Sequence, residues 1–188
     1  MSAANEEYPR RTGSAFPPVL DACCGSRMFW FDKADPRCLY VDKRRITHVA
    51  GPTRTHPKGE TVTVDPDVLA DFTDMPFADD TFCHVVFDPP HTLNMSETTR
   101  TVKKYGTLTD GWQDMLRAGF KECFRVLKPG GTLIFKWNEI HISLGSILKL
   151  TPEKPLYGHK SGRQQGTHWV AFIKAADADG GDNDDMRK

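Results

Sequence analysis

The chain has 188 residues, with 25 Lys and Arg against 25 Asp and Glu, so its formal net charge at pH 7 is zero. This length suits one domain with a sizeable core, and a neutral chain lacks the strong field that draws proteins to nucleic acid or membranes. No apolar run reaches the roughly 20 residues of a membrane span, and the polar N-terminus lacks the apolar stretch of a signal peptide. We therefore expect a cytoplasmic protein.

The five cysteines, at positions 23, 24, 38, 83 and 123, form no C-x-x-C pair. The sequence therefore predicts neither a disulfide framework nor a metal site, and reduced thiols fit a cytoplasmic protein. Residues 1–15 show no periodicity, and 175–188 hold no apolar side chain larger than Ala before Met186. We expect a disordered N-terminus over 1–15, one folded domain over 16–174, and a disordered acidic tail over 175–188.

Short apolar runs alternate with helical patterns along the middle of the chain. The predicted strands are 19–23, 38–42, 46–50, 61–64, 68–71, 84–87, 132–137 and 168–173. A short helix is expected over 26–33, and a longer one over about 111–127, where apolar residues recur at i, i+3 and i+4. Asp110 is its expected N-cap, and the Lys-Pro-Gly-Gly run at 128–131 is expected to end it.

The predicted topology is α/β, because strands that alternate with helices imply a mainly parallel sheet with right-handed crossovers. The segment 46–64 departs from this alternation. Its two β-branched stretches flank a polar loop rich in Gly and Pro, which predicts a β-hairpin with a long basic loop where a helix would usually cross.

The tetrapeptide Asp88-Pro89-Pro90-His91 follows the apolar run 84–87. Proline has no N–H for a sheet ladder and its φ is fixed, so the strand must end there in a rigid turn. In open α/β sheets the carboxyl ends of the strands form the ligand site. An Asp beside two stiff prolines and a flat ring suits the recognition of an exocyclic amino group.

This tetrapeptide resembles the Asp/Asn/Ser-Pro-Pro-aromatic signature of the S-adenosylmethionine (SAM)-dependent amino-methyltransferases, with His91 at the aromatic position as a departure. The resemblance implies a single Rossmann-like class I methyltransferase domain, whose mostly parallel central sheet has an antiparallel last strand. It implies SAM as the cofactor, and it makes Asp88, Pro89, Pro90 and His91 the catalytic segment.

Three other segments carry the same resemblance. The stretch 70–82 resembles the family's Asp-x-x-x-Leu-Pro-Phe-x-Asp-x-Ser-Phe-Asp, which implies that Asp71 binds the adenine amino group and that Phe72 packs on the ring. The run 126–131 resembles the segment before the family's fifth strand. The loop after the first predicted strand matches the family's glycine-rich loop only in part. The implied cofactor residues are Asp21, Cys23, Gly25, Asp42, Asp71 and Phe72.

Asp42 ends the second predicted strand, where an acid can accept hydrogen bonds from ribose hydroxyls. Dinucleotide-binding enzymes also place an acid there. They need Gly-x-Gly-x-x-Gly for a pyrophosphate, however, and Cys23-Cys24-Gly25 does not supply it.

Two basic stretches, 99–105 and 154–168, are expected to be mobile loops above the sheet edge. Their candidate substrate-binding residues are Arg100, Lys103, Lys104, His159, Lys160 and Arg163, with Tyr105 or Tyr157 available for stacking. The expected substrate is the amino group of adenine or cytosine in DNA or RNA, and a base in a duplex must be flipped out to react. The sequence has no room for a separate target-recognition domain, so specificity comes from loops or from a protein partner.

Three alternatives stay open at this point. The substrate could instead be a glutamine amide in a protein or a small-molecule amine. A third alternative is a non-catalytic SAM-binding subunit that positions an active partner, although such subunits tend to lose the acid that is present here as Asp88. The oligomeric state is not determined by the sequence.

Overall fold

The computed structural model describes residues 16–52, 57–96, 99–161 and 166–176, and within them seven strands form one sheet in the order β5-β2-β1-β6-β7-β9-β8. The strands are β1 Val19–Asp21, β2 Cys38–Asp42, β5 Val68–Leu69, β6 Phe82–Phe87, β7 Leu127–Asn138, β8 Tyr157–Ser161 and β9 Thr167–Ile173. The neighbours from β5 to β7 pair in parallel, while β9 runs antiparallel to both β7 and β8. This confirms the predicted α/β class with a mostly parallel sheet and an antiparallel last strand.

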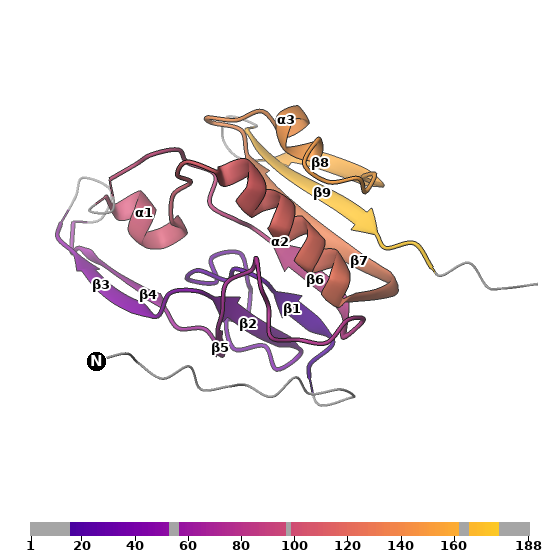
Figure 1. Cartoon of the computed structure of the whole chain (residues 1–188). Helices are drawn as coiled ribbons and strands as arrows, with labels where there is room; N and C mark the ends of the chain where they lie inside the picture. Colours follow the sequence, from indigo (N-terminus) through magenta and orange to yellow (C-terminus); the bar gives the residue numbers. More distant parts are fainter. Residues whose placement is uncertain (1–15, 53–56, 97–98, 162–165, 177–188) are drawn as a thin grey trace, which may run out of the picture.

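The order of the strands changes direction at β1, which lies between β2 on one side and β6 on the other. The helices of the described residues are α1 Arg100–Tyr105, α2 Trp112–Val126 and α3 Leu144–Leu148. The predicted hairpin is present as β3 Ile46–Ala50 and β4 Glu60–Val64, and it lies beside α1 at one end of the molecule (Figure 1). None of these helices is long and apolar enough to cross a bilayer.

The core forms where α2 packs on the sheet, over β6 and β7 (Figure 1). The apolar stripe that the sequence shows over 112–127 becomes the buried face of this helix, with Leu116 and Phe120 almost fully buried. Gly119 allows the close approach, since a Cβ there would lie 2.8 Å from both Phe72 and Phe87. On the opposite face of the sheet, a smaller cluster joins Tyr40 to the loop after β1.

The prediction of a short helix over 26–33 is wrong, because these residues form turns. Gly25 and Arg27 adopt φ values of 50° and 53°, which a right-handed helix does not accept. Side-chain contacts fix the turns instead. The Trp30 Nε1 donates to Asp21 Oδ2 at 2.7 Å, and the Arg27 guanidinium lies 3.7 Å from the centre of the Tyr40 ring.

The long helix is confirmed, but its two ends differ from the expectation. The N-cap is Gly111 in the left-handed region, with no side-chain cap, so the expected role of Asp110 is wrong. At the other end the chain passes directly from Val126 into β7, and the run 128–131 is part of that strand. Phe82 of β6 pairs with Leu127 and His84 pairs with Thr132, so β7 has more residues than β6 between these two pairs. A register irregularity accommodates them.

Both basic stretches that were expected to be loops contain regular structure. Thr99 caps α1, its hydroxyl accepting from Val102 N at 3.3 Å. The second stretch holds β8, which pairs antiparallel with β9, and α3 is a further element that was not predicted. The expected disordered N-terminus, 1–15, and all but the first two residues of the expected disordered tail, 175–188, lie outside the described residues.

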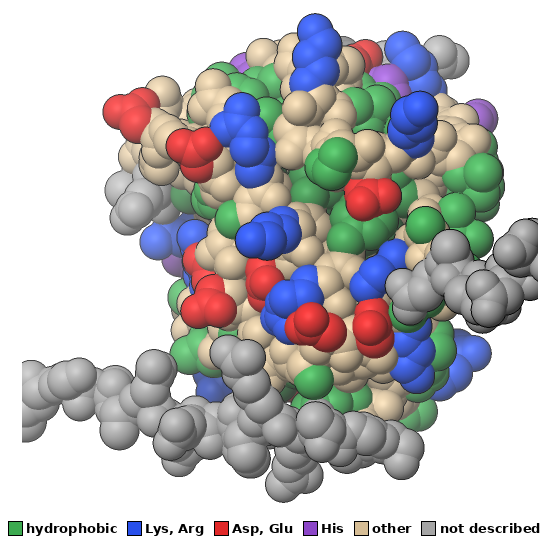
Figure 2. Space-filling model, turned by 45° about the vertical axis from the view of Figure 1, so that its right-hand side comes forward, with side chains coloured by type: hydrophobic (Ala, Val, Ile, Leu, Met, Phe, Trp, Pro, Cys, Tyr) green, Lys and Arg blue, Asp and Glu red, His purple; other side chains and the backbone are tan. Residues whose placement is uncertain are grey.

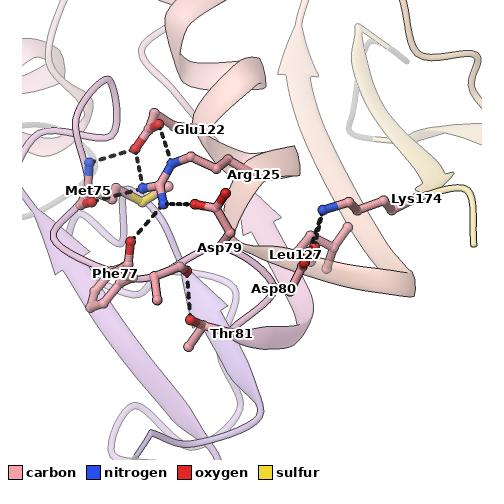
Figure 3. A network of polar contacts seen from close by, with 10 residues as sticks. Met75, Phe77, Asp79, Asp80, Thr81, Glu122, Arg125, Leu127 and Lys174 are labelled. Carbon is pink, nitrogen blue, oxygen red and sulfur yellow. Dashed lines mark hydrogen bonds and ion pairs between the residues drawn. The ribbon is translucent and has the colours of Figure 1, made fainter. Parts of the chain in front are cut away.

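Arg125 near the end of α2 holds the loop that runs from β5 to β6 (Figure 3). Its guanidinium donates to Met75 O at 3.0 Å, to Phe77 O at 2.7 Å, and to the carboxylates of Asp79 and Glu122 at 2.7–2.8 Å. Glu122 in turn accepts from Met75 N at 2.9 Å. The main chain of this loop is therefore fixed to the helix.

We predict that Arg125→Ala lowers the free energy of unfolding by about 2–4 kcal/mol, because it leaves the half-buried Glu122 and two main-chain carbonyls without their donor. Arg117→Ala is the matched control on the same helix. Among the residues that the structure describes, Arg117 pairs with Asp114 alone, at an exposed site, and its loss should cost under about 1 kcal/mol. Urea unfolding of both variants measures the difference, and equal losses would contradict this account.

Candidate functional site

A cavity of about 400 Å³ lies at the carboxyl ends of β1, β2 and β6, where the strand order changes direction and α/β sheets bind their ligands. Its volume is in the range of about 300–1,000 Å³ that is typical of small-molecule sites. The predicted site residues that line it are Cys23, Gly25, Asp42, Phe72, Asp88, Pro90, Lys103 and Lys104. Residues predicted for the cofactor and for the amine thus share one cavity.

Asp42, at the end of β2, accepts four hydrogen bonds from the protein. Gly25 N donates to Oδ2 at 3.0 Å, and Arg44 donates through N, Nε and Nη2 at 2.9–3.2 Å. An ionised carboxylate has about four acceptor sites, so all are used. The predicted acceptor of ribose hydroxyls is therefore already engaged by Arg44 and Gly25.

Arg44 also joins this strand end to α1. Its Nη1 donates to the carbonyl oxygens of Val102 and Lys103 at 3.3 and 3.5 Å. The end of α1 lies directly over the loop after β1, since a Cβ on Gly25 would be 3.3 Å from Lys104 O. The helix thus forms one wall of the cavity.

Asp71 and Phe72 separate in the structure. The Phe72 ring is buried and lines the cavity, whereas Asp71 does not line it. Asp71 Oδ1 accepts from Thr73 N and Oγ1 at 3.0 and 2.9 Å, and Lys43 Nζ lies 3.4 Å from Oδ2. Burial alone would raise the pKa of Asp71, but these hydrogen bonds and the Lys43 charge hold it below its ordinary value.

Asp21 lies behind the cavity wall and is fully buried. Burial raises its pKa to about 7, and the nearby Asp88 and Asp42 charges add to this, against the hydrogen bond from Trp30. The neighbouring thiols are also affected, because burial raises the pKa of Cys24 to about 12 and that of Cys23 well above its ordinary value. Both thiols therefore stay protonated at neutral pH, which removes them as nucleophiles.

Asp88 follows β6 and faces the cavity, together with Pro90, while Pro89 is buried. The Asp88 side chain is 13% exposed, and its Oδ2 lies 2.5 Å from Lys136 Nζ on β7. The carboxylate of the predicted catalytic turn is therefore engaged in an ion pair with a lysine.

His91 does not line the cavity. Its ring contacts that of Tyr105 at 5.9 Å between centres and meets Trp137 edge to face at 6.3 Å. Burial lowers the pKa of His91, and the nearby Asp88 charge only partly offsets this, so the ring is neutral at pH 7. Tyr105 is the aromatic side chain of this group that reaches the cavity wall.

The predicted basic residues do not gather in one place. Lys103 and Lys104 line the cavity, and Lys104 Nζ is 2.6 Å from Glu60 on β4. His159 and Lys160 are exposed on β8, where Lys160 Nζ lies 3.6 Å from Glu139. Arg100 begins α1, but its side chain lies outside what the structure describes, as does the whole of Arg163. On the face drawn in Figure 2, positive and negative side chains are interspersed.

Sequence reasoning missed Arg44 and Lys136, and each left a signal in the chain. Arg44 stands two residues after Asp42, a spacing that lets a carboxylate accept from a nearby main-chain N–H. Lys136 is the single charged residue in the apolar run 132–137, where a cation requires a partner.

The solved structures similar to this chain include the PH0226 protein of Pyrococcus horikoshii, with a TM-score of 0.52 at 15% identity over 83% of this chain and 81% of that one. A SAM-dependent methyltransferase of Methanosarcina mazei matches with a TM-score of 0.50 at 12% identity over 85% of this chain and 92% of that one. No protein-family model and no curated protein matches the sequence. The chain therefore has the Rossmann-like fold of the SAM-dependent methyltransferases.

We predict that Asp21→Asn makes the protein less sensitive to pH. In the folded state Asp21 titrates near pH 7 rather than near 3.8, so the folded state binds more protons between these values and stability falls as pH rises through them. Between pH 5.5 and 8.5 the wild type should lose about 2 kcal/mol from this residue. Urea unfolding at both pH values measures it.

The control is Asp114→Asn, at a carboxylate whose side chain is 87% exposed. It should leave the dependence of stability on pH unchanged. If Asp21→Asn and the wild type lose equal stability between the two pH values, Asp21 does not carry the predicted proton.

Proposed function

We propose that this protein is a SAM-dependent N-methyltransferase that acts on an exocyclic amino group, and that the group belongs to a nucleic-acid base. One observation carries the proposal. The cavity at the switch point of a methyltransferase fold is lined by Gly25, Asp42 and Phe72 and also by Asp88 and Pro90. A cofactor site and an amine site in one cavity are what a methyl transfer requires.

The residues on the cofactor side fit SAM. Gly25 leaves the wall open at a φ of 50°, where a side chain would be strained. The apolar Phe72 ring lines the cavity and suits adenine, whereas Asp71 lies outside the cavity lining and pairs with Lys43. Asp42 would accept the ribose hydroxyls in exchange for the hydrogen bonds of Arg44. SAM carries no phosphate, which agrees with a loop that lacks the Gly-x-Gly-x-x-Gly pattern.

The residues on the amine side account for the chemistry. When bound, SAM would supply a methyl group, with the electrons of the broken C–S bond left on sulfur, and the methylated nitrogen would release one proton to solvent. An aromatic amine is a weak nucleophile because its lone pair is delocalised into the ring. Asp88 and the Pro89 carbonyl act as acceptors that turn the amino hydrogens out of the ring plane, so that the lone pair points to the methyl group. The advantage is one of alignment and electrostatics.

A nucleic-acid base is the favoured substrate because the Asp-Pro-Pro turn suits a planar amine beside flat rings. His91 and Tyr105 lie next to each other at this turn, where a base can stack on the ring that faces the cavity. Lys103 on α1 lines the same cavity and can meet a backbone phosphate, whereas Lys104 would have to leave its ion pair with Glu60 to do so. Target choice then depends on α1, the hairpin β3–β4 and the β8–β9 hairpin, or on a protein partner.

The decisive experiment is incubation with SAM that carries a labelled methyl group, in separate pools of duplex DNA, single-stranded DNA, RNA and protein. Label in a nucleic-acid pool, in a methylated base after hydrolysis, is the expected result. Label in the protein pool would replace the base by an amide as the substrate. Calorimetry that shows binding of NAD but of neither SAM nor S-adenosylhomocysteine would overturn the proposed function.

Two variants separate the two halves of the site. Asp88→Ala should lower turnover on the order of a hundredfold to a thousandfold, because one aligned acceptor is lost, with the SAM dissociation constant near that of the wild type. Asp42→Ala should raise the SAM dissociation constant by about tenfold or more, since hydrogen bonds to a charged group are worth about 1.5–3 kcal/mol. Initial rates and calorimetry measure both effects.

The exposed variant Asp114→Ala serves as the control and should match the wild type in both measurements. Wild-type turnover of Asp88→Ala on a confirmed substrate would show that another group orients the amine.

A further inference from the structure

Lys136 stands at a defined place in the sheet. In β7 the side chains of Leu133, Phe135 and Trp137 are fully buried in the core, so Lys136 projects from the opposite face. The register pairs Phe87 with Phe135, which brings the next residues, Asp88 and Lys136, side by side where β6 ends, while β7 continues to Asn138. On its other side Lys136 pairs directly with Trp169 of β9.

The ammonium group of Lys136 is held from three directions. Its Nζ lies 2.5 Å from Asp88 Oδ2, 5.4 Å from the centre of the Phe29 ring and 5.6 Å from that of Trp169. The two rings contact each other edge to face. Aromatic faces attract a cation and keep water away from it, and the Lys136 side chain is only 20% exposed. The lysine is therefore fixed independently of Asp88.

The two partners differ in what they face. Asp88 lines the cavity, whereas Lys136 is not among its lining residues. Within the described part of the chain, Lys136 is also the only side-chain or main-chain hydrogen-bond partner of the Asp88 carboxylate. One oxygen is thus held from outside the cavity, and the other stays available for a ligand.

We propose that Lys136 is a positioning residue that fixes the Asp88 carboxylate for the incoming amine, an inference that rests on the proposed function. The prolines fix the main chain at this turn, but the terminal torsion of an Asp side chain is broad. A displacement of about 1 Å at a reacting group can cost about a hundredfold in rate. The ion pair removes this freedom, because turning the carboxylate breaks a charge-assisted hydrogen bond in a partly buried place.

The test compares Lys136→Met, Lys136→Arg and the control Lys174→Met on the substrate that the labelling experiment identifies. Lys174 forms a similar pair, with its Nζ 2.6 Å from Asp80 Oδ1 (Figure 3), and neither residue lines the cavity. Lys136→Met should lower kcat on the order of tenfold to a hundredfold, with the SAM dissociation constant unchanged. Lys136→Arg should restore most of the loss, and Lys174→Met should retain wild-type kcat.

Crystal structures of the wild type and of Lys136→Met give a second measurement that needs no activity. The Asp88 carboxylate should have one orientation in the wild type and a changed or multiple orientation in the variant. An unchanged carboxylate, or unchanged kcat in Lys136→Met, would overturn the role of Lys136. If Asp88→Ala abolishes turnover while Lys136→Met does not alter it, this inference fails and the proposed function stands.

Discussion

The reversal of strand order at β1 is the constraint on which the rest of the structure depends. Because β2 and β6 flank β1 in parallel, the acids at the ends of β1 and β2 and the acid directly after β6 meet at one edge of the sheet. Each acid needs a different solution to the same problem of burial. Burial raises the pKa of Asp21 to about 7, so that it holds a proton part of the time at neutral pH. Asp42 pairs with Arg44, and Asp88 pairs with Lys136. The cavity lies at this edge of the sheet, beside the three acids.

Much of the fold could be predicted because it depends on local pattern. The apolar runs predicted the central strands, and the apolar residues at i, i+3 and i+4 predicted α2. The errors arose where distant contacts overrule local preference, as in 26–33, where Trp30 turns back to Asp21. The basic stretches have no apolar periodicity, so the short helix α1 and the edge strand β8 had no signal of the kind that identified α2.

The acids of the candidate site could be predicted from the sequence, but the side chains that pair with them could not. Motifs in the sequence indicate which residues end strands, and hence Asp42 and Asp88. They do not give the register between β6 and β7, which decides that Lys136 faces Asp88. The pairing has a chemical consequence, since a carboxylate and an ammonium together are neutral. Such a site suits an uncharged aromatic amine better than an alkylammonium ion, which would meet the positive charge of the lysine nearby.

The contacts of Arg44 connect the Asp42 carboxylate to the helix that forms one wall of the cavity. A ligand that takes the carboxylate of Asp42 must displace the guanidinium, and the guanidinium also holds the last carbonyls of α1. Ligand occupancy and helix position are then linked, and this linkage acts equally in both directions. Substitutions in α1 that never touch the ligand would alter its affinity, and the ligand would alter the rate at which amide protons of α1 exchange with solvent. Binding at Asp42, on the cofactor side, would in this way affect α1, which also borders the amine side of the cavity.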